Sequence, residues 1–238
     1  MRVVLVQMSV KDGDVNNNLK KIKKMIEIVE GDIYLTPELS LTGFKDFLSE
    51  NDVSKMTKDL PCVGVGFREK DGDEKYNAYA ISCNGNIIYK RRKYMLFKPM
   101  KEHEELRKGE LPRPFVFKDI KLAINICYEV RFPELFWPLA KDVHAFVVPA
   151  AWPKVRVKAW RTLVRARAME NFAYVLGINR WGGGLFGPFG GNSLAVLPNG
   201  EELMVSEGEG VLIVNVDREL VSEAREFPAF EDRLRLMR

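Results

Sequence analysis

Short apolar segments typical of β-strands alternate with segments of helical spacing along the whole chain. The first pair is a β-branched strand pattern at Arg2–Met8 and a helical pattern that repeats through Leu19, Ile22, Ile26 and Val29. Hydrophobic residues make up 46% of the 238 residues, which is enough apolar material for a buried core. The alternation favours an α/β fold over an all-helical or an all-β one.

The remaining strand patterns include both hairpins and strand–helix units. We expect strands at Ile33–Leu35, Cys62–Phe67, Tyr76–Cys83, Asn86–Tyr89, Phe115–Phe117, Lys121–Cys127, Ala145–Val148, Tyr174–Asn179, Ser193–Leu197, Glu202–Val205 and Val211–Val216, and helices at Phe132–Ala140 and Arg156–Phe172. Asn84-Gly85 is a two-residue hairpin signal, so part of the sheet structure is antiparallel. Two mixed sheets packed face to face, with helices outside, would bury these strands. No linker or repeat divides residues 1–238, so we expect a single domain.

Charge and cysteine content exclude several classes of protein. The 37 Lys and Arg residues against 33 Asp and Glu leave a net charge of +4, spread along the chain, so we expect neither a nucleic acid nor a membrane as partner. Three cysteines without CxxC spacing form neither a disulfide framework nor a zinc site. The pattern predicts a cytoplasmic, reducing environment, and a single glutamine, Gln7, is a weak sign of heat adaptation.

The scarcity of histidine removes the commonest general base. Only His103, in a polar segment, and His144, before an apolar strand, are present, and serine-protease and papain-like triads lack their local signatures. The chain has no GxxxxGK[ST], GxGxxG or HExxH motif. We therefore expect no metal and no cofactor.

Cys127 is the cysteine whose position suggests chemistry. It ends an apolar strand pattern, and Pro133 shortly after it suits the first turn of a helix. A thiol at such a strand–turn–helix elbow would gain a lowered pKa and nearby backbone N–H groups. Burial in the core is the competing interpretation, and we assign Cys62 and Cys83, which lack the turn, to the core.

Two further charged residues matter only in combination with Cys127. Glu38 follows the second strand in a loop that ends at Gly43, and Lys93 ends the strand of the predicted hairpin. Each of them taken alone fits a solvated surface charge. Together they provide a carboxylate and an ammonium group for a cysteine that has no histidine to activate it.

Three motifs in this order resemble the nitrilase, or carbon–nitrogen hydrolase, superfamily. They are Pro37-Glu38, the R-K-x-x-L-F motif at Arg92–Phe97, and the C-Y-[DE]-x-R-F-P-E motif at Cys127–Glu134. The resemblance covers essentially the whole chain. It implies a four-layer α-β-β-α sandwich, a single carbon–nitrogen hydrolase domain over residues 1–238, and pairing into a homodimer or a higher homo-oligomer.

A longer pattern between Ala151 and Arg180 is similar to the ω-amidase branch of this superfamily. That likeness implies hydrolysis of a small linear amide, a 2-oxo acid amide, to the acid and ammonia. N-carbamoyl hydrolase, deaminated-glutathione amidase, nitrilase and a non-catalytic assembly member are the alternatives. Two departures bear on the substrate: Glu129 replaces a commoner aspartate, and Asn192 stands where many relatives carry histidine.

The resemblance also implies a role for each motif residue. Cys127 would be the nucleophile that forms a thioester, Glu38 the general base and then acid, and Lys93 the cation that faces the oxyanion. The backbone N–H of Tyr128 would share that last task, and water would complete the reaction. An auxiliary carboxylate would keep Lys93 charged, and we choose Glu102 for it.

Other residues near the motifs are candidates for substrate binding or have a structural alternative. Glu104 rivals Glu102, and a solvated acidic loop fits both. Arg131 would suit a substrate carboxylate, although a salt bridge that holds the elbow is the competing interpretation. Trp152, Tyr94 and Phe44 would shape an apolar pocket wall, unless they are plain packing residues.

Overall fold

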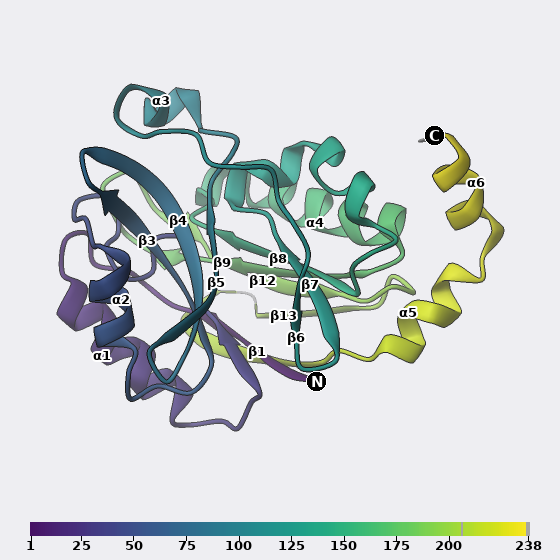
Figure 1. Cartoon of the computed structure of the whole chain (residues 1–238), viewed down its shortest axis with the longest axis horizontal. Coiled ribbons are helices and arrows are strands. Elements are labelled where there is room, and N and C mark those ends of the chain that lie inside the picture. The colour runs from purple at the N-terminus through teal and green to yellow at the C-terminus, as the bar shows by residue number, and fades with distance from the viewer. Residues whose placement is uncertain (206, 237–238) are drawn as a thin grey trace.

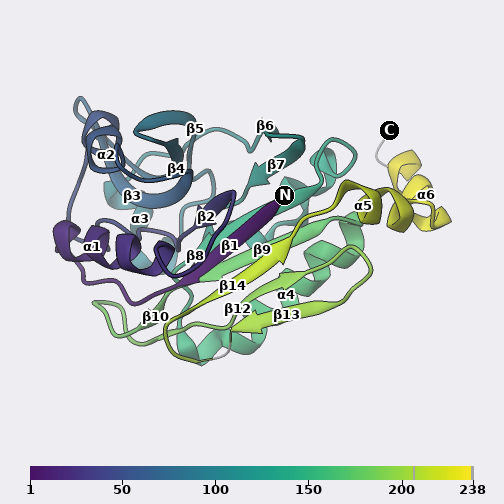
Figure 2. The same cartoon turned by 90° about the horizontal axis from the view of Figure 1, so that it is seen from below.

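The computed structural model describes residues 1–205 and 207–236, and it contains two six-stranded mixed sheets (Figures 1 and 2). The first sheet has the order β14 (Gly210–Asn215), β1 (Arg2–Gln7), β2 (Ile33–Leu35), β3 (Val63–Asp71), β4 (Glu74–Cys83) and β5 (Asn86–Arg92). The second has the order β13 (Glu202–Val205), β12 (Ser193–Val196), β9 (Tyr174–Asn179), β8 (Ala145–Ala150), β7 (Ile120–Ile124) and β6 (Phe115–Phe117). The central strands β1–β2–β3 and β7–β8–β9 run parallel, and the outer ones are antiparallel. A short hairpin joins β10 (Trp181–Gly182) to β11 (Phe189–Gly190).

The side chains of β1 show how the four layers form. Val3 and Leu5 point into the core between the sheets, and Val4 and Val6 point into a second core beneath the helices. This alternation is the two-residue period of a strand that is buried on both faces. The layers follow as helix, sheet, sheet and helix, and the expected α-β-β-α sandwich is confirmed.

Each outer face is covered by helices. Helices α1 (Val15–Ile26) and α2 (Glu50–Met56) cover the first sheet, and α4 (Val157–Asn171) covers the second (Figure 1). Asp14 caps α1 through the Asn17 N–H, which satisfies one of the free donors at that end. No helix among the described residues is long and apolar enough to cross a membrane.

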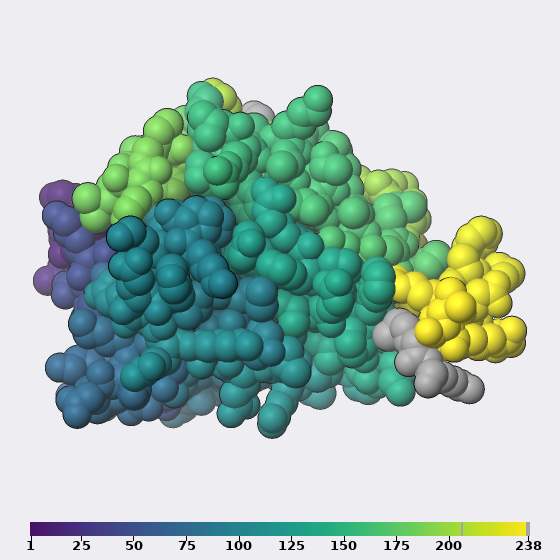
Figure 3. Space-filling model, turned by 90° about the horizontal axis from the view of Figure 1, so that it is seen from above, coloured from purple at the N-terminus to yellow at the C-terminus, as the bar shows by residue number. Residues whose placement is uncertain are grey.

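The C-terminal helices extend beyond the sheets (Figures 1 and 2), and the yellow C-terminal segment projects from one end of the molecular surface (Figure 3). They are α5 (Arg218–Arg225) and α6 (Pro228–Leu236). Phe230 of α6 packs against Phe172 with ring centroids 5.6 Å apart, so this tail contacts the end of α4. From the sequence, Met237 and the amphipathic segment Phe230–Leu236 are candidates for contact with a partner subunit or for folding back on the domain. Met237 lies outside the described residues.

The helix expected at Phe132–Ala140 is wrong. The segment instead forms two 3₁₀ turns, Pro133–Leu135 and Trp137–Leu139. Pro138 explains the difference, because it lacks the N–H that a continuous α-helix would need there. Short helical pieces also occupy Lys98–Met100, Glu102–Glu105 (α3), Cys127–Arg131 and Lys154–Arg156.

The assignment of Cys62 and Cys83 to the core as free cysteines is also wrong. The two residues are half-buried and form a disulfide. The register of β3 and β4 places Val63 opposite Ser82, so the preceding Cys62 meets Cys83 across the hairpin. A separation of 21 residues does not reveal this pairing without the register. The disulfide also removes the argument for a reducing environment that we based on cysteine number.

We predict that the purified, unreduced chain titrates as one thiol in denaturant, because Cys127 is the one free cysteine. Ellman's reagent measures this number, and reduction should raise it to three. The Cys127→Ala variant is the control and should titrate as none before reduction. Three thiols in the unreduced wild-type chain would contradict the disulfide.

Candidate active site

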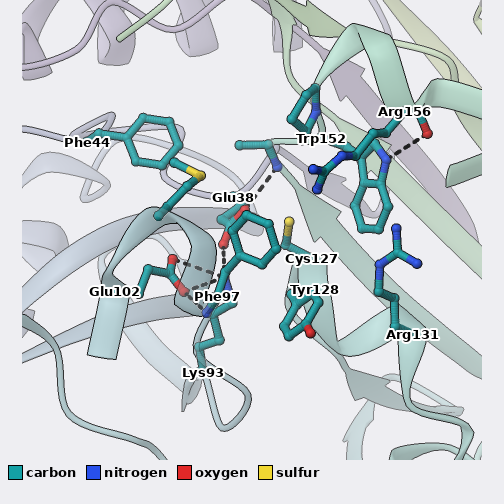
Figure 4. Close-up of a pocket in the computed structure, with 13 residues that line it drawn as sticks. Glu38, Phe44, Lys93, Phe97, Glu102, Cys127, Tyr128, Arg131, Trp152 and Arg156 are labelled. Carbon is teal, nitrogen blue, oxygen red and sulfur yellow. Dashed lines mark hydrogen bonds and ion pairs between the residues drawn. The ribbon is translucent and has the colours of Figure 1, made fainter. Parts of the chain in front are cut away.

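The three motif residues meet in one pocket at the seam between the two sheets (Figure 4). Glu38 follows β2 and Lys93 follows β5, both from the first sheet, and Cys127 follows β7 of the second. The pocket holds about 420 Å³ of space, part of it open to solvent. Its lining is Glu38, Phe44, Lys93, Phe97, Met100, Glu102, Cys127, Tyr128, Arg131, Ala151, Trp152, Pro153 and Arg156.

Lys93 is the centre of a buried ionic network. Its ammonium group donates to Glu38 Oε1 at 2.8 Å and to the Glu102 carboxylate at 3.1 Å, and its side chain is 2% exposed. The amide of Asn77 spans the same two carboxylates, at 2.8 Å from Glu38 and 3.3 Å from Glu102. Glu102 also accepts the Phe97 N–H at 2.6 Å, which ties the start of α3 to the site.

Burial and charge act in opposite directions on these groups. Burial disfavours a charged Lys93, but the charges of Glu102 and Glu38 outweigh it and raise the Lys93 pKa above its usual value. Burial likewise raises the Glu38 pKa, yet the Lys93 charge and hydrogen bonds from Lys93, Cys127 and Asn77 bring it below normal. Both groups are therefore charged at neutral pH.

Cys127 is the first residue of the short 3₁₀ turn Cys127–Arg131, which follows β7. Its φ of 50° lies in the left-handed region, which residues other than glycine rarely adopt. Such a backbone costs about 1–3 kcal/mol and is typical of functional turns. The expected strand and turn are present, and the turn is the 3₁₀ segment Cys127–Arg131. The α-helix expected after it is replaced by the two 3₁₀ turns at Pro133–Leu135 and Trp137–Leu139.

The pKa of the Cys127 thiol is the opposite of what the sequence led us to expect. Burial, and then the neighbouring Glu38 charge, raise the Cys127 pKa well above its ordinary value. The Lys93 charge and the Ala151 N–H oppose this shift without reversing it. The resting side chain is thus a protonated thiol that donates a hydrogen bond to Glu38, and the expected lowering of its pKa by a helix N-terminus is wrong.

Glu129 links the cysteine turn to the lysine segment. Its buried carboxylate forms a bidentate pair with Arg91, with distances of 2.5 and 2.8 Å. It also accepts the Ile126 N–H at 2.5 Å and the Tyr94 N–H at 2.7 Å. Glu129, the glutamate that replaces a commoner aspartate, therefore links the turn of Cys127, next to the second sheet, to the segment of Lys93, next to the first sheet.

The apolar wall contains most of the expected aromatic residues. Phe44 and Trp152 line the pocket with Phe97 and Met100. Tyr94 does not line it, because its ring lies under the Lys108 ammonium, 3.5 Å from it, and only its backbone serves the site through Glu129. Tyr94 is the candidate that the structure places elsewhere.

Two alternatives left open by the sequence are resolved by position. Glu102, not Glu104, reaches Lys93, since Glu104 pairs with Lys101 at 3.5 Å. Arg131 does not hold the elbow through a salt bridge, because Arg91 makes that pair with Glu129. The guanidinium of Arg131 lies 5.0 Å from the Trp152 ring, at the pocket.

Three contributors were not found from the sequence. Asn77 and Arg91 carry no motif, and their roles depend on the pairing of β4 with β5, which aligns Tyr79 with Arg91. Ala151 donates its N–H to Glu38 Oε2 at 3.0 Å. The signal for Ala151 is its place directly after β8, parallel to the strand that leads to Cys127.

Comparison with known proteins identifies the family of the chain. A model of the carbon–nitrogen hydrolase family matches residues 2–226. The 2-oxoglutaramate amidase of Bacillus subtilis (strain 168) is 31% identical over 248 aligned residues, with 95% of each chain covered. Omega-amidase YafV of Yersinia enterocolitica is 29% identical, and the alignment covers 98% of this chain and 96% of that one.

Solved structures share the fold. XC1258 from Xanthomonas campestris, a CN-hydrolase superfamily protein, superposes with a TM-score of 0.89 at 23% identity, covering 98% of this chain and 96% of that one. Nit3 of Saccharomyces cerevisiae, a nitrilase superfamily member, gives a TM-score of 0.82 at 25% identity, covering 95% and 93%. Since the family model spans nearly the entire sequence, the chain belongs to the carbon–nitrogen hydrolase family, the nitrilase superfamily, and is a carbon–nitrogen hydrolase of the amidase kind.

Proposed function

We propose that this enzyme is an ω-amidase, which hydrolyses the terminal amide of a small 2-oxo acid through a thioester on Cys127. The observation that carries the proposal is the single buried network of Cys127, Glu38 and Lys93. The relatives named as 2-oxoglutaramate amidase and omega-amidase support this substrate class.

The acylation step follows from the network. Glu38 takes the thiol proton as Cys127 Sγ bonds to the amide carbon, and the carbonyl electrons move to oxygen. Lys93 and the Tyr128 N–H face that oxyanion; Tyr128 lies in the first positions of a 3₁₀ turn, whose N–H groups have no partner within the turn. Each such donor typically contributes about 3–4 kcal/mol in the transition state. Glu38 then protonates the leaving nitrogen, and ammonia departs.

The second half reuses the same groups. Water donates a proton to Glu38 as its oxygen attacks the thioester carbon, and the C–S bond then breaks. The proton returns to sulfur, so thiol and carboxylate are restored. Glu102 and Asn77 are positioning residues in this scheme, because they hold Lys93 and Glu38.

The resting protonation states set when the nucleophile forms. A thiol of raised pKa does not transfer its proton to a carboxylate of lowered pKa unless bonding to carbon occurs in the same step. Proton transfer is therefore coupled to attack, and substrate positioning controls the reaction.

The proposal also includes three properties carried over from the sequence. They are one domain over residues 1–238, a homodimer or higher homo-oligomer, and a cytoplasmic location. The disulfide is compatible with that location, because intracellular proteins of hyperthermophiles are often disulfide-rich.

Ammonia release from 2-oxoglutaramate, a carbamoyl-amino acid, a deaminated glutathione and a nitrile tests the substrate class directly. We expect 2-oxoglutaramate to give the largest kcat/KM, and Cys127→Ala to abolish release while circular dichroism stays unchanged. A higher kcat/KM for another member of the set would reassign the substrate. Turnover by Cys127→Ala would refute the nucleophile.

The pH dependence of kcat/KM tests the protonation states. Because the Glu38 pKa is lowered and the Cys127 pKa is raised, we expect a flat profile between about pH 6 and 9, with the acidic limb below the usual glutamate value of about 4.3. An inflection near about 8.5, the usual thiol value, would contradict a protonated resting thiol.

The pH profile of the Asn77→Ala variant tests whether the acidic limb belongs to Glu38. Asn77→Ala removes a hydrogen bond that lowers the Glu38 pKa, so its acidic limb should move to higher pH. Asn86→Ala, at an exposed position on β5, is the matched control and should keep the wild-type profile.

A further inference from the structure

The positive charges of the pocket are unevenly engaged. Three lining residues are cationic, namely Lys93, Arg131 and Arg156. Lys93 is neutralised by two carboxylates. Among the described residues, the guanidinium groups of Arg131 and Arg156 have no ion pair and no hydrogen bond, whereas Arg91 is paired bidentately with Glu129. The pocket thus presents two unpaired cations.

Both arginines are in contact with Trp152. Arg131 ends the 3₁₀ turn that begins at Cys127, and Arg156 ends the turn Lys154–Arg156. Trp152 is buried, its indole N–H donates to the Arg156 carbonyl at 2.9 Å, and Arg131 lies over its ring. Figure 4 shows both guanidinium groups on the Trp152 side of Cys127, across from Lys93 and Glu102.

This arrangement separates two ends of the pocket. At the end with Glu38, Lys93 and Glu102, the charges are paired with one another. At the Trp152 end, the guanidinium groups of Arg131 and Arg156 each carry five N–H donors. The planar arrangement of these donors matches the two oxygens of a carboxylate in a bidentate manner. Phe44, Phe97 and Met100 also line the pocket and provide apolar surface for a short carbon chain.

We propose that Arg156, together with Arg131, binds the carboxylate of the substrate at the end remote from the scissile amide. The ligand class is a short linear amide with a free terminal carboxylate, and Arg156 is the residue that selects it over neutral amides. This inference rests on the proposed amidase function and adds the residue that recognises the negative charge of the substrate.

The selectivity follows from the cost of an unpaired charge. A carboxylate that reaches the arginines gains charge-assisted hydrogen bonds, whereas a methyl group at the same place gains none. Binding there also fixes the distance between the anchored end and Cys127, so the amide carbon is held at the thiol.

The test compares two substrates of the same chain length, glutaramate and pentanamide, in which a methyl group replaces the carboxylate. We expect Arg156→Gln to lower the ratio of their kcat/KM values by about 10–100-fold, mainly through the KM of glutaramate. Lys20→Gln is the matched control, because it removes an exposed charge from α1, a helix that contributes no lining residue to the pocket. Its ratio should equal that of the wild type.

Binding without turnover separates this inference from the amidase proposal. Calorimetry with glutarate should show binding to Cys127→Ala and a loss of about tenfold or more in affinity when Arg156→Gln is added. An unchanged substrate ratio, or an equal fall for both amides, would overturn the role of Arg156. If wild type releases no ammonia but glutarate binds through Arg156, the amidase proposal fails and the carboxylate site stands.

Discussion

The buried ammonium group of Lys93 is the interaction on which the site depends. A charge with so little exposure is costly unless it is paired and hydrogen-bonded, and Glu38 and Glu102 supply both. These partners come from the loop after β2 and from α3. Pairing of the Lys93 charge therefore holds two segments together that are far apart in the sequence. The same pairing gives Glu38 its lowered pKa and leaves it ready to receive a proton.

A second constraint brings the thiol to that network. Cys127 sits in a left-handed backbone conformation, which is retained only where the surroundings hold it. Glu129 provides much of that support, since its carboxylate binds Arg91 and the Ile126 N–H on the two sides of the seam. Removing one partner of such a buried pair typically costs about 3–5 kcal/mol, so this contact ties fold stability to site geometry.

The sequence was sufficient for the layers and for the residues that meet. Strands that are apolar at nearly every position require burial on both faces. Three separated motifs indicated Glu38, Lys93 and Cys127. What it lacked was the register between strands: the Cys62–Cys83 bond and the contacts of Asn77 all depend on which residues lie opposite in β3, β4 and β5.

The local sequence also could not predict the role of residues for which the direction of the side chain decides whether they reach the site. Glu102 and Glu104 lie on one short helix, and only the path of that helix brings the first to Lys93. Tyr94 adjoins Lys93 in the chain but turns to Lys108. Arg156 lies within the pattern that resembles the ω-amidase branch, but the sequence assigned it no role, and its place at the site appears only when the pocket lining is known.

The central claim is that Cys127 carries the acyl group during turnover. Rapid acid quench of the enzyme with glutaramate, followed by peptide mass spectrometry, measures this directly. The account predicts that the peptide containing Cys127 gains the mass of the acyl group in the first turnover. Ammonia release with that peptide unmodified at every time, or an adduct on another residue, would contradict it.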